Sequence, residues 1–289
     1  MRKYLKNIEI VGATMVYKEG EQCRWSLDWL YANCDRVCIL LDNWDDKTEK
    51  IVKEYAKAHP KRTRIIYSDV EVEYDKNTYR GFVKHRFKKL QASVRECMLK
   101  EINAMNDEKP IDILIWPDSD EVFIDEFHKY LEMFWNERTE FDYMMLGFVE
   151  VYDSMQMILS QKMAPHGRVY RYKPNMTIHP WVGRTRYHPH CDEKRPWKLR
   201  HTVIHVNQLT KEYRQRRRFF ENSKKKDMNT RELWILPKDV REMTADEIAD
   251  YQPGPHQTPP LNASIKLTDY LNNKEKYINK YNLKLWTQD

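Results

Sequence analysis

One apolar run that ends in a cluster of acids most constrains how this chain can fold. Residues 111–116 are rich in isoleucine, which is typical of a strand buried on both faces. Pro117 should end that strand because proline has no N–H to donate to a sheet. Asp118, Asp120 and Glu121 follow at once. Open α/β sheets bind ligands beyond the carboxyl ends of their strands, so the sequence predicts a ligand site here.

The same acids predict a metal ion. Asp118 and Asp120 are two residues apart, so in an extended chain their side chains would point the same way. Two like charges held together need a counter-charge, and carboxylate oxygens suit Mg²⁺ or Mn²⁺. A solvated acidic turn is the alternative. The position directly after a buried strand favours the metal site.

Strand-like and helical stretches alternate through the first 125 residues. Apolar runs predict strands at 8–16, 35–41 and 64–70, and amphipathic spacing predicts helices at 23–33, 48–59 and 85–105. This alternation predicts an α/β fold with a mostly parallel central sheet. Neither a GxGxxG turn nor a GxxxxGK[ST] loop is present, which disfavours a dinucleotide-binding Rossmann domain and a P-loop NTPase.

The second half of the chain has a different pattern. A short helix is predicted at 127–135, strands at 141–152, 169–172, 177–178 and 198–206, and a long basic helix at 210–228. A Pro-rich loop at 251–260 precedes a stretch with helical spacing at 261–286. We therefore expect a mixed C-terminal extension of the sheet followed by terminal helices.

Composition indicates the class of protein and the cellular compartment to expect. Charged residues make up 33% of the chain, and no apolar run approaches the length of a membrane span. The basic N-terminus has no apolar stretch behind it, so we expect no secretory signal. The five cysteines form no C-x-x-C pair, which is typical of free thiols in a reducing compartment. The expected location is the cytoplasm, or the host cytoplasm if a phage encodes the chain.

The order of motifs resembles the family 2 glycosyltransferases of the GT-A fold. The matching residues are Lys18-Glu19 after the first strand, Asp42 after the second, Asp46-Lys47-Thr48, Arg95-Glu96 in a helix, and Asp118-Ser119-Asp120-Glu121. The resemblance covers residues 8–125 well and 199–220 more loosely. It implies a nucleotide-sugar-binding α/β half at 1–125, an acceptor-binding half of the same domain at 126–250, and a linker with a C-terminal helix at 251–289.

The resemblance also implies roles for individual residues. The donor would be a nucleoside-diphosphate sugar, most readily a UDP-sugar, and the cofactor Mn²⁺ or Mg²⁺. Asp120 would be the main metal ligand, with Asp118 on the ribose or the metal. A histidine on a late strand would complete the metal site, and His205 fits best, with His201 as the alternate. The other donor contacts expected are Val16, Tyr17, Glu19, Asp42, Arg95 and Ser119.

Six histidines fall between His166 and His205, and a zinc site is the alternative interpretation of this stretch. Zinc is disfavoured because the spacing of His188, His190 and Cys191 does not match the usual structural zinc sites.

The base that would activate an acceptor is left open. An inverting transfer needs a carboxylate to deprotonate the attacking group. Candidates after the acidic motif are Glu150, Asp153, Asp192 and Glu193. A retaining transfer would need no such base, and the sequence does not decide between the two.

Two basic clusters suggest an anionic acceptor. One contains Lys84 and Arg86, and the other contains Arg214, Arg217 and Arg218. Clustered cations with interleaved aromatic residues suit nucleic acid, which leads to the hypothesis of a phage-type transferase that glycosylates a hydroxymethylated, flipped-out DNA base. The alternatives are contacts to the donor diphosphate, a glycan acceptor, a nucleotidyl- or phosphotransferase, and a non-enzymatic nucleic-acid-binding module.

Overall fold

The computed structural model describes residues 5, 7–16, 20–42, 46–68, 91–152, 156–158, 166–174, 176–180, 187–190, 196–208 and 265–266. The chain forms two compact units. The first contains Met1–Met145 and His166–Trp197, and the second contains Leu146–Pro165 and Lys198–Asp289. The parallel sheet and the candidate site belong to the first unit.

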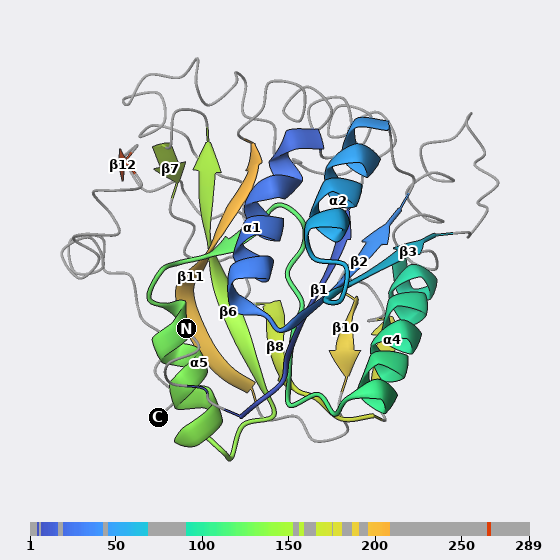
Figure 1. The fold of residues 1–289 in the computed structure, drawn as a ribbon. Coiled ribbons are helices and arrows are strands. Elements are labelled where there is room, and N and C mark those ends of the chain that lie inside the picture. Colours follow the sequence, from blue (N-terminus) through green and yellow to red (C-terminus); the bar gives the residue numbers. More distant parts are fainter. Residues whose placement is uncertain are drawn as a thin grey trace, which may run out of the picture. The chain divides into compact units, whose positions relative to one another are not determined.

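Helices and strands alternate in the first unit as the sequence predicts (Figure 1). In chain order they are β1 (Ile10–Val16), η1 (Gly20–Gln22), α1 (Cys23–Asn33), β2 (Arg36–Leu41), α2 (Asp46–Ala58), β3 (Thr63–Tyr67), α4 (Gln91–Glu108), β4 (Ile113–Ile115), β5 (Glu121–Phe123), α5 (Phe127–Asn136), β8 (His166–Arg171), β9 (Thr177–Pro180) and β10 (Tyr187–His190). Strand β4 ends two residues before Pro117, in agreement with the expected stop.

The central sheet of this unit is mostly parallel, which confirms the predicted fold class. Its strand order is β8-β4-β1-β2-β3. Strands β1, β2, β3 and β4 are parallel to their neighbours, and β8 joins the edge of β4 in the antiparallel direction. The chain moves outward from β1 to β3 and then returns to the other side of β1 with β4. That reversal lies between β1 and β4, which is where open α/β sheets form a ligand crevice.

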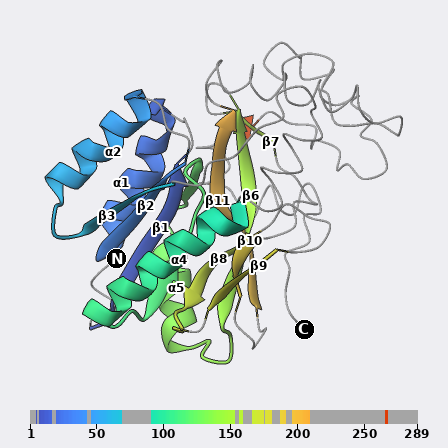
Figure 2. The same ribbon diagram turned by 90° about the vertical axis from the view of Figure 1, so that its right-hand side faces the viewer.

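Helices cover both faces of this sheet (Figure 2). Helices α1 and α2 lie on one face and α4 on the other. Apolar residues of α4 recur every three or four positions and face one side of β1 and β2. The buried residues that meet there are Val94, Met98, Leu99, Ile102 and Met105 from α4, and Val11, Ala13, Cys38 and Leu40 from the strands.

Gly12 allows α1 to approach the other face of β1 closely. A Cβ atom at this position would lie 2.7 Å from Cδ2 of Leu30 and 2.8 Å from Sγ of Cys34. Both distances are shorter than the contacts that Cβ atoms make in proteins, and the side chains of Leu30 and Cys34 are fully or almost fully buried. The glycine therefore sets the distance between this helix and the sheet.

We expect Gly12→Ala to lower the free energy of unfolding by about 1–3 kcal/mol, the usual cost of overpacking a core. Urea denaturation followed by circular dichroism measures the change. Cys34→Ala removes one of the two clashing atoms, so the double variant should lose less than the sum of the single losses. Strictly additive losses would contradict this account of the packing.

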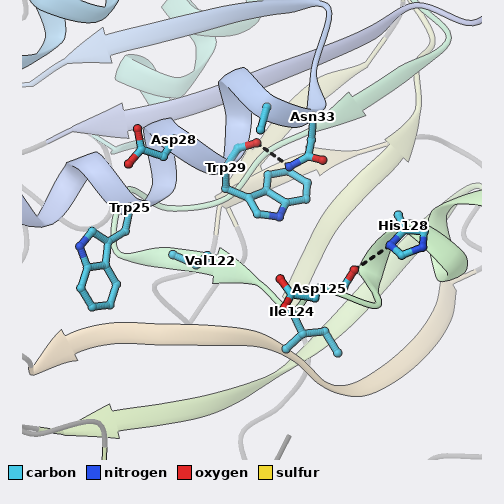
Figure 3. A pocket seen from close by; sticks show the side chains of 9 residues that line it. Trp25, Asp28, Trp29, Asn33, Val122, Ile124, Asp125 and His128 are labelled. Atoms are coloured by element: carbon cyan, nitrogen blue, oxygen red, sulfur yellow. Dashed lines mark hydrogen bonds between the residues drawn. The ribbon is translucent and has the colours of Figure 1, made fainter. Parts of the chain in front are cut away.

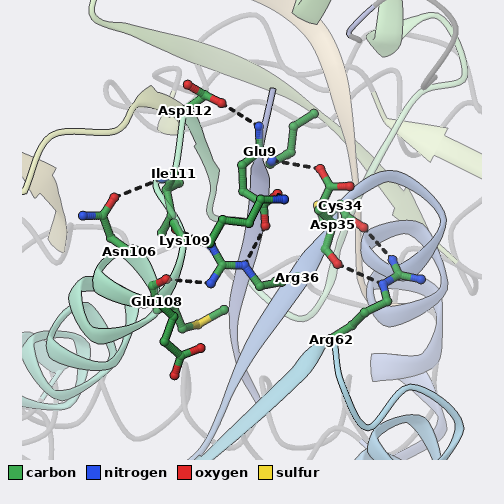
Figure 4. A network of polar contacts seen from close by, with 12 residues as sticks. Glu9, Cys34, Asp35, Arg36, Arg62, Asn106, Glu108, Lys109, Ile111 and Asp112 are labelled. Carbon is green, nitrogen blue, oxygen red and sulfur yellow. Dashed lines mark hydrogen bonds and ion pairs between the residues drawn. The ribbon is translucent and has the colours of Figure 1, made fainter. Parts of the chain in front are cut away.

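Charged residues at the amino ends of the strands form a structural network (Figure 4). Glu9 is 4% exposed and accepts hydrogen bonds from Arg36 Nε at 2.6 Å and from Lys109. Nη1 of Arg36 also donates to the carbonyl of Met105 at 2.6 Å. The Asp112 carboxylate accepts the N–H of Glu9 at 2.6 Å. These acids join strand ends to one another and to α4, which leaves the opposite edge of the sheet for a ligand site.

The second unit contributes most of β6 (Tyr143–Tyr152), with β7 (Gln156–Ile158), β11 (Pro196–Gln208) and β12 (Ile265–Lys266). β7 pairs antiparallel with β6 and with β12. The expectation of a helix from residue 261 is wrong at Ile265–Lys266, because these residues pair with β7 instead. The basic helix expected at 210–228 lies outside the described residues. None of the helices that the structure describes is long and apolar enough to cross a membrane.

Candidate functional site

The first component of the site is the junction of β1 and β2 at their carboxyl ends. Val16 lies opposite Leu41 in the parallel register, and the N–H of Asp42 donates to the carbonyl of Val16 at 3.0 Å. Asp42 is 8% exposed. Beyond β1, the N–H of Gly20 donates to Oγ1 of the buried Thr48 at 2.9 Å, which ties η1 to the first turn of α2. Two of the residues implied by the resemblance, Val16 and Asp42, are therefore neighbours.

The second component is the acidic cluster after β4, which forms a turn. The N–H of Glu121 donates to the carbonyl of Asp118 at 3.1 Å, and the N–H of Asp118 donates to Oε2 of Glu121 at 3.1 Å. The expectation that Asp118 and Asp120 share one face of an extended chain is wrong, because these two hydrogen bonds close the chain on itself. Ser119, Asp120 and Glu121 are 3%, 9% and 2% exposed, so this is not a solvated turn.

A buried arginine from β8 pairs with two of these acids. The N–H of Trp116 donates to the carbonyl of Arg168 at 2.7 Å, which fixes Arg168 beside the end of β4. Its side chain is 1% exposed. Its Nη2 donates to Oδ2 of Asp118 at 2.7 Å and to Oε1 of Glu121 at 2.5 Å, and its Nε donates to Oε2 of Glu121 at 2.5 Å. Such two-pronged pairing fixes orientation as well as charge.

A second arginine holds the other oxygen of Asp118. Arg95 on α4 is 6% exposed, and its Nη2 donates to Oδ1 of Asp118 at 2.7 Å. Its guanidinium carbon lies 5.9 Å from the centre of the Trp116 ring. Nε and Nη1 of Arg95 are buried without a hydrogen-bond partner among the described residues. The resemblance selected Arg95 for this region, and the structure joins it directly to the acidic turn.

The carboxylates of the turn favour the charged form of Arg168. Burial alone would lower the pKa of Arg168, but the facing carboxylates of Asp118 and Glu121 outweigh burial and raise it. The turn thus gathers three acids, Asp118, Asp120 and Glu121, and Arg95 and Arg168 pair with two of them, Asp118 and Glu121.

Arg168 is the functional residue that sequence reasoning missed. Its signal was weak: a lone arginine directly before the strand predicted at 169–172. Nothing in the sequence alone indicates that β8 runs antiparallel to β4 and so brings this residue to the acids.

Several predicted site residues lie outside what the structure describes. The residues in question are Tyr17, Glu19, Lys84, Arg86, Asp153, Asp192, Glu193, Arg214, Arg217 and Arg218. Glu150 lies on β6, and His201 and His205 lie on β11, all in the second unit and with side chains that are not described. Their roles stay predictions.

The described residues fit a metal ion only in part. Within them there is no group of three or more His, Cys, Asp or Glu side chains arranged to hold one. Both oxygens of Asp118 already accept an arginine hydrogen bond. Asp120 is the acid of this turn that the resemblance implies as the main metal ligand, and a full coordination shell would need ligands from the donor, water or the rest of the chain.

Comparisons with known proteins find solved structures that are only loosely similar to this chain. No protein-family model matches the chain, and neither does any curated protein. A glucose-1-phosphate thymidylyltransferase from Bacillus anthracis, solved with sucrose, superposes with a TM-score of 0.30 at 10% identity. The match covers 53% of this chain, which spans 59% of that protein's length. The mannosyltransferase PcManGT from Pyrobaculum calidifontis, solved with GDP-Man and Mn²⁺, superposes with a TM-score of 0.41 at 9% identity, over 96% of this chain and 86% of the other. Superpositions this loose assign no function.

Proposed function

We propose that this protein is a metal-dependent glycosyltransferase that moves a sugar from a nucleoside-diphosphate sugar to an acceptor hydroxyl. The observation that carries the proposal is the acidic turn after β4, with Asp118 fixed by Arg95 and Arg168 through contacts of 2.7 Å. This turn follows the strand at which the order of the parallel sheet reverses. It therefore lies where such sheets bind nucleotides.

Each residue of the site has a proposed role. Asp42 and Val16, joined at the ends of β2 and β1, would contact the nucleoside, together with Tyr17, Glu19 and Ser119. Asp118, with both oxygens held by arginines, would present a fixed edge to the ribose. Its further role as a metal ligand is the less favoured one, because those oxygens are already engaged.

Asp120 would hold Mn²⁺ or Mg²⁺, and His205 stays the further ligand proposed from the resemblance. Such an ion would supply positive charge that stabilises a leaving diphosphate. The chain's own contribution is to orient the donor. Because Arg168 and Arg95 pair with Asp118 and Glu121, these two carboxylates would repel the donor's negative phosphates less.

The identities of the acceptor and of the catalytic base are further proposals, which depend on the proposed transfer reaction. Asp153, Asp192 and Glu150 remain the candidates for deprotonating the acceptor. A hydroxymethylated DNA base is proposed because of the basic segments that contain Lys84, Arg86, Arg214, Arg217 and Arg218. A glycan acceptor is the second candidate, and a groove described below favours it.

A binding experiment tests the donor class. The protein is heated with UDP, GDP or dTDP, each with and without Mn²⁺. A ligand that binds only the folded state stabilises it by about 2.7 kcal/mol at 100 times its Kd. We expect at least one nucleoside diphosphate to raise the melting temperature, and Mn²⁺ to increase that shift.

Nucleoside monophosphates and adenosine are the controls, because they lack the diphosphate that would bridge to the metal. No shift with any nucleoside diphosphate, in the presence or absence of metal, would contradict the proposed function. Incorporation of radiolabelled sugar from the preferred donor into DNA or into glycans then separates the two acceptor classes.

A further inference from the structure

A surface groove separate from the acidic turn runs along α1 (Figure 3). It has a volume of about 480 Å³, within the usual range of ligand sites. Its walls come from α1, from β5 and from the start of α5. The aromatic and polar side chains that line it are Trp25, Asp28, Trp29, Asn33, Asp125 and His128.

The groove has an aromatic surface that the fold holds rigid. The ring of Trp29 lies 4.3 Å from that of Phe123 and 5.9 Å from that of Phe127, between centroids. Phe123 and Phe127 are buried. Trp25, one helical turn before Trp29, is 39% exposed and has no ring partner among the described residues. Trp29 is thus held in place by two buried rings, and the exposed Trp25 beside it offers an apolar face on which a ligand can stack.

Hydrogen-bonding groups are spread around this surface. The carboxylate of Asp125 is exposed and makes no hydrogen bond or ion pair within the described part of the chain. Asp28 accepts from the hydroxyl of Tyr55 through one oxygen, which leaves the second for a ligand. Asn33 donates its amide to the carbonyl of Trp29 at 2.7 Å, which fixes the side chain with its own oxygen available. Acceptors that alternate with an aromatic face match a molecule with C–H faces and hydroxyl edges.

We propose that this groove binds a neutral saccharide chain. The apolar face of a pyranose ring would stack on Trp25, and ring hydroxyls would donate to Asp28, Asn33 and Asp125. Figure 3 shows Asp28 and Asp125 on different sides of the Trp29 indole. The two carboxylates do not converge on one point, as binding a single cationic group would require. Their negative charges would repel the phosphates of a nucleic acid.

The groove begins close to the proposed catalytic edge. Ser26, next to Trp25 in α1, lies with its Oγ 3.5 Å from the carbonyl oxygen of Asp118. Val122, which lines the groove, directly follows Glu121 of the acidic turn. Resting on the proposed function, the inference is that the saccharide is the extended, non-reacting part of a glycan acceptor. Binding energy from such a remote part would position the reacting hydroxyl.

The test is binding of a panel of neutral hexasaccharides (cello-, malto-, manno- and chitohexaose) by titration calorimetry. We expect at least one to bind the full-length protein, and Trp25→Ala to weaken that binding by about tenfold, which is about 1.4 kcal/mol. Asp125→Asn should weaken it as well, because a neutral amide is a poorer acceptor. Tyr67→Ala is the matched control: Tyr67 is 38% exposed, almost the same as Trp25, but lies on β3 outside the groove.

Three outcomes would overturn the proposal: no panel member binds, the Trp25 and Tyr67 variants bind equally well, or the groove variants lose binding to duplex DNA or to an oligolysine peptide but not to a saccharide. Nucleoside-diphosphate binding with Mn²⁺ is measured on the same variants. Donor binding without saccharide binding would remove this groove assignment and leave the proposed function. Saccharide binding without donor binding would remove the proposed function and leave the saccharide groove.

Discussion

Asp120→Asn should greatly slow metal-dependent turnover of the nucleotide sugar while leaving the fold intact. The substitution keeps the shape of the side chain and removes the carboxylate that is proposed to hold the metal ion. A metal that stabilises a leaving diphosphate contributes several kcal/mol, so the rate should fall on the order of 10³-fold. Donor hydrolysis or transfer at saturating Mn²⁺ measures the loss.

The matched control is Asp107→Asn, on the exposed last turn of α4. It removes the same charge from the same unit, but far along the helix from Arg95, and should leave the rate unchanged. Asp120→Asn should also lose the part of the thermal shift that depends on Mn²⁺ and keep the melting temperature of the free protein. Retained metal dependence in this variant would show that the ion is held by other ligands.

The position of the site could be predicted from the sequence because it depends on local patterns. The apolar run before Pro117 predicts a buried strand, and alternation with helices predicts parallel neighbours, so the acids had to lie at the carboxyl edge. The contact between Asp42 and Val16 follows from the same reasoning, since adjacent parallel strands end together.

The backbone conformation of the acidic segment and the arginine that pairs with it could not be predicted in this way. An Asp-x-Asp-Glu segment is compatible with an extended chain or with a turn, and the hydrogen bonds between Asp118 and Glu121 decide the matter. The counter-charge expected from a metal is supplied in part by Arg168, which is 50 residues away from Asp118. Contacts of such long sequence separation depend on strand direction, and the spacing of apolar residues carries no information about direction.

Arg168→Met should produce the largest loss of stability of any single substitution at the site. Arg168 is 1% exposed and Glu121 is 2% exposed, and they share two hydrogen bonds of 2.5 Å. Removal of one partner from a buried ion pair leaves the other charge without compensation, at a cost of about 3–5 kcal/mol. Guanidinium denaturation followed by tryptophan fluorescence measures the change in unfolding free energy.

Arg24→Met is the matched control for charge and side-chain length. Arg24 bonds to two carboxylates as well, at 2.6 Å to Glu21 and 2.8 Å to Glu54, but it is 35% exposed. Exposed pairs contribute less than about 1 kcal/mol, so this variant should remain close to the wild type. Similar losses of unfolding free energy in the two variants would mean that burial does not raise the cost of breaking the Arg168 pair.

A double variant separates the stability of this pair from its role in the site. Arg168→Met combined with Glu121→Leu replaces both charges with apolar groups and should recover much of the stability lost by Arg168→Met alone. Asp118 would still be held by Arg95, but on one oxygen only. If the arginines serve to orient the donor, the double variant should remain folded and bind nucleoside diphosphate more weakly than the wild type. Wild-type donor affinity in this folded variant would limit Arg168 to a structural role.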